Sequence, residues 1–358
     1  MKQRIQGIDL ARAFAIIGMI IVNFKIVFGI QGSETLNTIA GFFDGKAAAT
    51  FVTLAGIGVA LMVKSALKEN DNTKLKKVRK TILKRSLLLF VLGLSYMEIW
   101  PADILHYYGV YMAILALLLT FSKKLIFRLG WVIVFTFPLL LLIFDYELGW
   151  NFKSLEYKAF WTIKGFIRNL IFNGFHPVLP WISFLFIGFW FGSFDLQNKS
   201  FLRKMAVKSF LGFIAIQFLS RFFIVLLSQS NPESINTFSE FFGTQPMPPL
   251  PFYMINGICF SLFAISSCLL IDLKYQSSFI LTAFKNMGKM ALTLYVAHII
   301  IGMGIIDVLF PNTLGTYSIH FSVLYAITFS LFCILFAYLW LKKYKSGPLE
   351  WLFRKLTQ

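Results

Sequence analysis

The sequence predicts an all-α polytopic membrane protein, because the chain is very apolar, sparsely charged and rich in long hydrophobic runs. Of its 358 residues, 58% are hydrophobic and 14% are charged, whereas soluble domains carry about 25% charged residues. One run, FSVLYAITFSLFCILFAYLWL, is long enough to cross a bilayer as a helix. Membrane β-barrel strands would instead alternate apolar and polar residues. These observations exclude an ordinary soluble enzyme, a disordered chain and a β-barrel.

Hydrophobic runs of about 20 residues, the length that a helix needs to cross a bilayer, predict ten transmembrane spans within a single domain over residues 1–358. The spans cover about 9–30, 47–63, 84–100, 103–121, 126–144, 178–194, 207–228, 251–271, 286–308 and 320–341. No small-residue cleavage pattern follows the first span, so we expect it to be a retained helix rather than a signal peptide.

The basic residues predict how the spans are oriented. Of the 34 Lys and Arg residues, 26 fall in segments that share a side with the N-terminus, nine of them within residues 64–85, and five fall in segments on the opposite side. Because cytoplasmic loops are enriched in Lys and Arg, both termini are expected in the cytoplasm. The same distribution accounts for the net charge of +18, so we expect no nucleic-acid partner.

Two segments on the opposite side are longer than simple turns. Residues 145–177 contain KAFWTIKGFIRNLIF, whose aromatic and basic residues are typical of an interfacial helix. Residues 229–250 end in a proline cluster, which forbids helix and predicts an extended approach to the eighth span.

Ionisable residues inside a bilayer cost at least about 2.5 kcal/mol each near the helix centre, so those in the first span need a reason. Asp9 and Arg12 are three positions apart and can pair on one helix face. Asn23 lies three turns beyond Arg12 on nearly the same face. These residues form either a polar stripe that binds a ligand or a helix-start pair with an amide that only packs.

The fourth span opens with DILHYYGV, in which Asp103 and His106 are three positions apart. A carboxylate beside an imidazole can orient the ring and raise its basicity, as the base of an acyl transfer requires. Alternatively, the pair is a solvated helix terminus whose acid is favoured by the helix dipole.

Two further histidines are candidates for the same chemistry. His176 precedes a proline in NGFHPVLPW, which favours an extended backbone at that point, although a lone histidine near the interface is usually only a polar tip. His298 lies near mid-membrane, where a histidine is a functional candidate by default, although a hydrogen bond to Tyr295 would satisfy it structurally. Stock motifs such as HExxH, CxxC and the Walker loop do not occur, so we expect no metal cofactor.

Several segments together resemble a known family. They are GIDLARAFAIIGMIIVNF, FDGKAAATFVTLAGIGVAL, DILHYYGVY, NGFHPVLPW, PMPPLPFYM, GKMALTLYVAHIIIG and GPLEWLFR. In this order they resemble the YeiB-like family of bacterial inner-membrane proteins, with a C-terminal signature region at about 200–358. That family is similar to the heparan-α-glucosaminide N-acetyltransferase group of the transmembrane acyltransferase superfamily.

The resemblance implies a ten-helix bundle in the bacterial cytoplasmic (inner) membrane. Such a protein takes an acyl group from cytosolic acyl-CoA, with acetyl-CoA as the favoured donor, and passes it to an acceptor at the outer face. The superfamily has an arginine followed eleven positions later by a histidine in the first span. Here Arg12 matches the arginine and Asn23 replaces the histidine, as it does in the heparan acetyltransferase branch. That branch uses a histidine in the next outer loop, where this chain has Glu34.

From the residues and the resemblance together we predict a transmembrane acyltransferase. Arg12, paired with Asp9, and Asn23 are expected to bind the donor. His106 with Asp103, His176 or His298 is expected to deprotonate the acceptor. The partners would be membrane lipid, acyl-CoA and an unidentified sugar, lipid or small-molecule acceptor, and a homodimer is left open. The main alternative function is a transporter of a small anionic or lipid-like solute, which the same intramembrane charges, including Arg221 and Asp307, would serve. A third alternative is a non-catalytic membrane scaffold or sensor.

Overall fold

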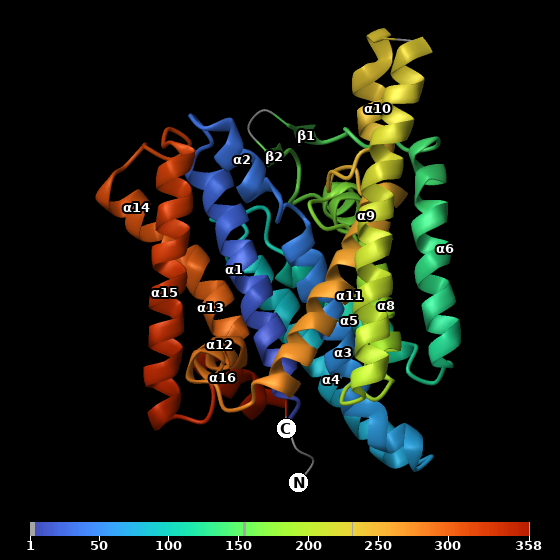
Figure 1. Ribbon diagram of the computed structural model, residues 1–358, viewed down its shortest axis with the longest axis vertical. Helices are drawn as coiled ribbons and strands as arrows, with labels where there is room; N and C mark the ends of the chain where they lie inside the picture. The colour runs from blue at the N-terminus through green and yellow to red at the C-terminus, as the bar shows by residue number, and fades with distance from the viewer. Residues whose placement is uncertain (1–3, 153–154, 231, 358) are drawn as a thin grey trace. The chain divides into compact units, whose positions relative to one another are not determined.

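The computed structural model describes residues 4–152, 155–230 and 232–357 and is shown in Figure 1. Its elements in chain order are α1 (Gln6–Phe28), α2 (Glu34–Gly41), α3 (Lys46–Lys68), α4 (Asn72–Leu94), α5 (Leu105–Leu117), α6 (Lys123–Leu141), β1 (Trp150–Asn151), β2 (Glu156–Tyr157), α7 (Ile163–Arg168), the π-helix η1 (Asn169–Asn173), α8 (Val178–Gly192), α9 (Lys199–Ser230), the 3₁₀-helix η2 (Pro232–Ser234), α10 (Ile235–Phe242), α11 (Pro251–Lys274), α12 (Phe279–Lys289), α13 (Ala291–Ala297), the π-helix η3 (His298–Met303), α14 (Gly304–Leu309), α15 (Ile319–Lys343) and α16 (Pro348–Thr357).

These elements confirm the all-α polytopic membrane fold. In the part of the chain that the structure describes, seven helices are long and apolar enough to cross a membrane, or eight if the bent pair Ile163–Asn173 and Val178–Gly192 counts as one span. Each of the ten predicted ranges overlaps helix. However, α5 has only 13 residues. Helix α4 begins at Asn72, so the basic residues from Lys74 to Arg85 lie on this helix rather than in a loop. The count of ten spans stays a prediction.

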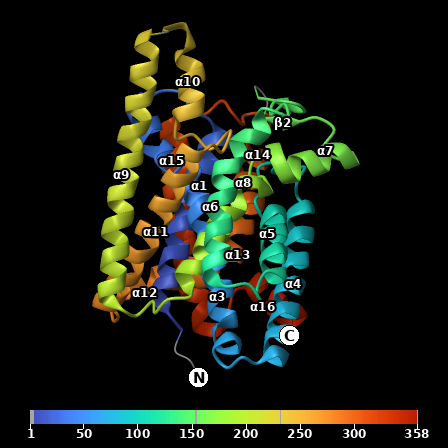
Figure 2. The same ribbon diagram turned by 90° about the vertical axis from the view of Figure 1, so that its right-hand side faces the viewer.

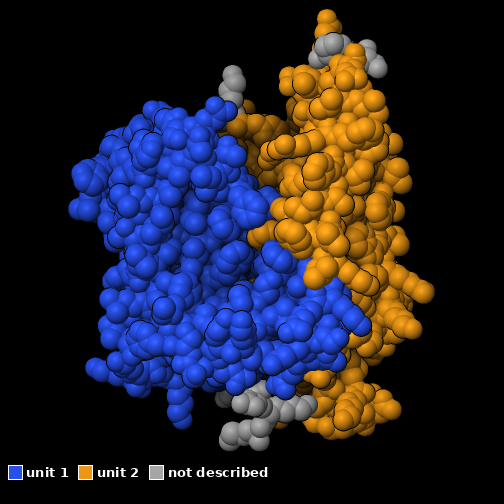
Figure 3. Space-filling view, in the orientation of Figure 1, with its two compact units in different colours: residues 1–51, 196–206, 261–358 blue, residues 52–195, 207–260 orange. Residues whose placement is uncertain are grey.

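Figure 3 colours two compact units within the chain. Unit 1 comprises residues 1–51, 196–206 and 261–358, and unit 2 comprises residues 52–195 and 207–260. Helices α3, α9 and α11 each contribute residues to both units. The single domain over residues 1–358 stays a prediction.

In unit 1, helix α1 packs against α12, α13 and α15. Phe24 of α1 is fully buried and contacts the rings of Tyr325 and Phe329 of α15 at centroid distances of 5.2 and 5.6 Å. Helix α16 is held to the start of α13, because Glu350 Oε1 accepts hydrogen bonds from the backbone N–H groups of Leu292 (2.7 Å) and Thr293 (3.1 Å). The predicted apolar spans of unit 1 thus form a helical core around α1.

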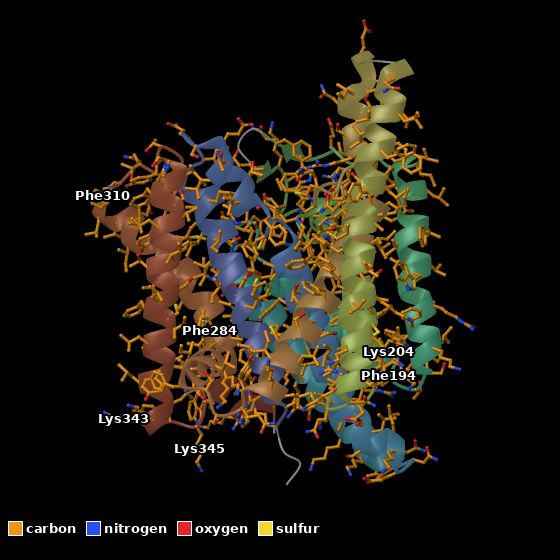
Figure 4. All side chains as sticks on the ribbon, viewed as in Figure 1. Phe194, Lys204, Phe284, Phe310, Lys343 and Lys345 are labelled. Carbon is orange, nitrogen blue, oxygen red and sulfur yellow. The ribbon has the colours of Figure 1, made fainter. Side chains whose placement is uncertain are left out.

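The elements of unit 1 can be followed from one end of the unit to the other. In Figure 1 the start of α1 and helix α16 lie at the lower end of the unit, and α2 lies at its upper end. Figure 4 places Lys343 and Lys345 at the lower end of the unit and Phe310 at its upper end. Two basic residues thus lie at the end that carries both the start of α1 and α16, and the location of both termini in the cytoplasm stays a prediction.

In unit 2, Figure 2 shows α4 and α5 side by side, and α5 and α6 both pack against α8. The predicted interfacial helix begins at Ile163, where Thr162 caps it by accepting a hydrogen bond from the N–H of Gly165. It therefore starts five residues later than Lys158, the first residue of the apolar and basic stretch. Asn173, at the end of η1, anchors the segment by donating to the backbone oxygens of Tyr146 and Leu148 at 2.7 and 3.0 Å.

Candidate functional site

The first cluster of functional side chains lies at the start of α1 in unit 1. Asp9 is 1% exposed and accepts two hydrogen bonds of 2.7 Å from Arg4 and one of 3.0 Å from Arg12 Nη1. The predicted pairing of Asp9 with Arg12 is thus confirmed, whereas Arg4 was missed because it precedes the helix. The hydrogen bond to Asp9 raises the pKa of Arg4. Two guanidinium groups share one carboxylate here, so N–H donors remain that can bind phosphate oxygens.

The second cluster, also in unit 1, joins Asn23 of α1 to His298. Asn23 Nδ2 lies 2.9 Å from His298 Nε2, and His298 Nδ1 contacts the backbone oxygen of Tyr295. A carbonyl oxygen can only accept, so Nδ1 carries the proton and Nε2 accepts the Asn23 N–H. His298 is fully buried and begins the π-helical turn η3, a feature that often marks functional sites. Both nitrogens of the His298 ring are therefore hydrogen-bonded within unit 1.

We expect the Asn23–His298 hydrogen bond to contribute measurably to stability. In a double-mutant cycle with Asn23→Leu and His298→Phe, the coupling free energy should be about 0.6–1.7 kcal/mol, the range found for buried side-chain hydrogen bonds in membrane proteins. Reversible unfolding in mixed micelles gives the four free energies of unfolding that the cycle needs. Additive effects of the two substitutions would show that this hydrogen bond does not stabilise unit 1.

The third cluster lies at the start of α5 in unit 2 and contains Asp103 and His106. Both side chains are completely buried, so they do not form a solvated helix terminus. His106 Nδ1 lies 3.3 Å from Asp103 Oδ2, and Asp103 Oδ1 accepts a hydrogen bond of 2.6 Å from the Tyr96 hydroxyl. The carboxylate therefore orients the imidazole with Nδ1 protonated, which leaves the Nε2 lone pair as the basic site.

Close packing of α4 against the start of α5 fixes this geometry. A Cβ atom added to Gly93 of α4 would lie 2.5 Å from Asp103 Oδ2 and would overlap the backbone nitrogen of His106. Asp103 Oδ2 also accepts the N–H groups of Leu105 (2.7 Å) and His106 (3.2 Å), so the same carboxylate caps the helix. The carboxylate that orients the ring is thus held by the first turn of α5.

His176, in the segment between η1 and α8, joins the third cluster. Its ring lies 6.0 Å from the ring of Tyr107 and 4.6 Å from that of Trp181, and the Tyr107 ring lies 3.9 Å from that of His106. The Tyr107 hydroxyl donates to Asn169 Oδ1 at 2.5 Å. These contacts bring His176 close to the Asp103–His106 pair, although the two segments are about 70 positions apart in the chain.

Three polar atoms of this cluster are buried without a hydrogen-bond partner among the described residues. They are His106 Nε2, His176 Nδ1 and Trp181 Nε1. Buried polar groups are normally paired, so three unsatisfied atoms together indicate a place where a polar ligand can bind. Two of the three belong to predicted site residues. Trp181 was not predicted as a site residue, and the one sequence signal for it is its position five residues after His176.

The predicted site residues thus fall into two groups. Unit 1 brings Asn23 and His298 into contact and pairs Asp9 with Arg12, while unit 2 gathers Asp103, His106 and His176. No three His, Cys, Asp or Glu side chains of the described chain are grouped so that they could hold a metal ion.

Two of the charged residues that support the transporter hypothesis have a different environment. Arg221 of α9 and Asp307 of α14 are both exposed, unlike Asp9, Asp103 and His298, which are buried. Neither residue therefore lies among the buried polar groups that a solute path through a helical bundle uses.

Two family comparisons match the chain. The family described as "Heparan-alpha-glucosaminide N-acetyltransferase, catalytic" matches residues 4–226, and the family described as "Protein of unknown function (DUF418)" matches residues 190–358. No curated protein matches the sequence. The two matched ranges confirm the resemblance to YeiB-like proteins and to the acetyltransferase group. Because the first range covers more than half of the chain and contains six of the seven predicted site residues, the protein belongs to the family of heparan-α-glucosaminide N-acetyltransferase catalytic domains.

Proposed function

We propose that this protein is a transmembrane acetyltransferase of the bacterial cytoplasmic membrane. It takes the acetyl group of cytosolic acetyl-CoA and transfers it to a hydroxyl or amino group of an acceptor at the outer face. Family membership supports an acetyltransferase-type enzyme. The observation that carries the proposal is the buried Asp103–His106 pair, whose Nε2 has no hydrogen-bond partner among the described residues.

His106 acts as the base in this proposal. Its Nε2 takes the proton from the acceptor hydroxyl or amine as the acceptor attacks the thioester carbonyl, the carbon–sulfur bond breaks, and the thiolate of coenzyme A leaves. Asp103 stabilises the imidazolium that forms, because its carboxylate already faces Nδ1 at 3.3 Å. His298 is less suited to this role, since Asn23 already occupies its Nε2. His176 lies beside His106 and is the next candidate base.

The donor binds through cationic and amide groups of α1. Arg12 is 29% exposed and gives only one of its N–H groups to Asp9, so its other N–H groups can donate to the phosphates of coenzyme A. Asn23 is the second α1 residue proposed to bind the donor, and its amide would have to leave the His298 ring to do so. The basic residues of 64–85 add an attractive potential for the anionic donor.

Acetyl-CoA turnover by the purified protein in proteoliposomes tests this function. We expect acetyl-CoA to bind, and coenzyme A to be released when amino sugars with a phosphate or carboxylate group are supplied, with glucosamine, the sugar in the family's description, as the comparison that carries no anionic group. Binding is measured by calorimetry against free coenzyme A, and release by thiol detection. Solute flux across the vesicle membrane with no acetyl-CoA consumption would favour the transporter instead.

Arg12→Gln is expected to weaken acetyl-CoA binding at least about 10-fold, because a hydrogen bond to a charged group contributes about 1.5–3 kcal/mol. The control is Arg203→Gln, which removes an exposed arginine of α9 in the same unit. Its dissociation constant should stay at the wild-type value. Equal dissociation constants for both variants would remove Arg12 from the donor site.

A further inference from the structure

Three charged side chains meet beyond the Asn23 level of α1, in unit 1. Lys25 of α1 binds Asp44, in the turn between α2 and α3, with its Nζ 2.7 and 2.6 Å from the two carboxylate oxygens. Lys46 follows as the first residue of α3. Gly41 packs beside this ion pair, since a Cβ there would lie 3.3 Å from Asp44 Oδ2 and 3.6 Å from Lys25 Nζ.

Lys46 is buried but has no acidic partner. Lys46 is 7% exposed. No carboxylate of the described residues lies within 4.0 Å of its ammonium group, and the carboxylate of Asp44 is bound by Lys25. Asp44 attracts the Lys46 ammonium group only at longer range, because both of its carboxylate oxygens are bound by Lys25, and Lys25 itself repels Lys46. The group that faces Lys46 Nζ is the ring of Phe42, at 5.5 Å from the centroid. The cluster therefore carries one uncompensated positive charge.

The energetics favour an external partner for this charge. Removing an ammonium group from water is unfavourable unless the group is paired, and the cation–π contact with Phe42 offsets only part of that cost. The residue lies in the apolar stretch Glu34–Lys68, which is long enough to cross a membrane. An anion bound to Lys46 would offset the burial cost, whereas the described residues provide none.

We propose that Lys46 binds an oxyanion group, a phosphate or a carboxylate, carried by the acceptor substrate. Lysine presents a compact point charge with three donors, which suits such a group. The proposal rests on the proposed acetyltransferase function, because it names the class of acceptor: an anionic molecule rather than a neutral one. The predicted orientation is consistent with this proposal, because the charge distribution predicts Lys46 on the outer side of the membrane, where the acceptor is expected.

The test measures anion-dependent stability of the full chain in neutral detergent. Lys46→Met removes the charge and keeps an unbranched apolar side chain, and Lys158→Met, at an exposed lysine, is the control. With inorganic phosphate or glucuronate instead of chloride at equal ionic strength, we expect the Tm of the wild type and of Lys158→Met to rise by about 2 °C or more. The Tm of Lys46→Met should not change.

A second arm distinguishes a lipid headgroup from a soluble acceptor. The same proteins are reconstituted in phosphatidylcholine vesicles with and without phosphatidylglycerol. If a lipid supplies the oxyanion, phosphatidylglycerol stabilises the wild type but not Lys46→Met, and soluble anions have no effect. No anion response of the wild type in either arm, or an equal response of Lys46→Met, overturns the proposal. Acetyl-CoA turnover is measured separately, so a loss of the proposed function would not be mistaken for a loss of this site.

Discussion

Replacement of His106 by glutamine is expected to lower acetyl transfer by about 10²–10⁴-fold, the usual contribution of a general base. Glutamine keeps a polar side chain at the start of α5 but cannot accept a proton near neutral pH. The rate is measured as coenzyme A release in the proteoliposome assay. Acetyl-CoA binding should stay at the wild-type level, because the proposed donor residues lie on α1.

The physical basis is the state of the imidazole. Asp103 fixes the proton on Nδ1, and the buried Nε2 has no hydrogen-bond partner among the described residues, so the lone pair is available to the acceptor. Asp103→Asn should lower the rate as well, because an amide that donates to Nδ1 would reverse the tautomer. Its effect has to be separated from the loss of the helix cap that the same carboxylate provides.

Two histidine variants serve as controls for this prediction. His320→Gln changes an exposed histidine at the start of α15 and should leave the rate unchanged. His176→Gln should lower the rate less than His106→Gln, because no carboxylate within hydrogen-bonding distance orients that ring among the described residues. A wild-type rate for His106→Gln with a large loss for His176→Gln would transfer the base assignment to His176.

Sequence reasoning succeeds where the interacting residues are close in the chain. Asp9 with Arg12 and Asp103 with His106 are each three positions apart, and helix geometry alone brings such side chains to one face. The sequence does not predict whether these side chains are buried. Asp103 and His106 are both completely buried, although the start of a helix is usually exposed. That burial results from the packing of α4 against α5.

Long-range contacts could not be predicted in the same way. Asn23 and His298 are 275 positions apart, and their hydrogen bond depends on how α13 and η3 pack against α1. Hydropathy predicts that α1 crosses the membrane but carries no information on its rotation. The proposed oxyanion site at Lys46 depends on a contact of the same kind, because Lys25 of α1 binds the carboxylate of Asp44, 19 positions away.

The packing of α1 itself leads to the second large prediction, that Gly288→Ala destabilises unit 1 by about 3 kcal/mol, the upper end of the usual cost of overpacking. Gly288 of α12 contacts the backbone of α1 directly. A Cβ added there would overlap the backbone oxygen of Asp9 and would lie 2.6 Å from its carbonyl carbon and 3.0 Å from its Cα. Because these atoms belong to the helix backbone, they cannot rotate away as a side chain would, and α1 would have to move.

The matched control for this prediction is Gly304→Ala. Gly304 begins α14, and an added Cβ there meets no atom within 4 Å. Alanine at such a helical position should be neutral or stabilise by about 0.5–1 kcal/mol, because glycine loses more backbone entropy on folding. Reversible unfolding in mixed micelles measures both variants.

Because Gly288 packs on Asp9, its substitution should also displace the carboxylate that holds Arg4 and Arg12. Acetyl-CoA binding by Gly288→Ala should therefore fall together with its stability. Wild-type stability of Gly288→Ala would mean that α12 does not approach α1 this closely, and the Asp9 cluster would then lose the support on which its proposed role in donor binding depends.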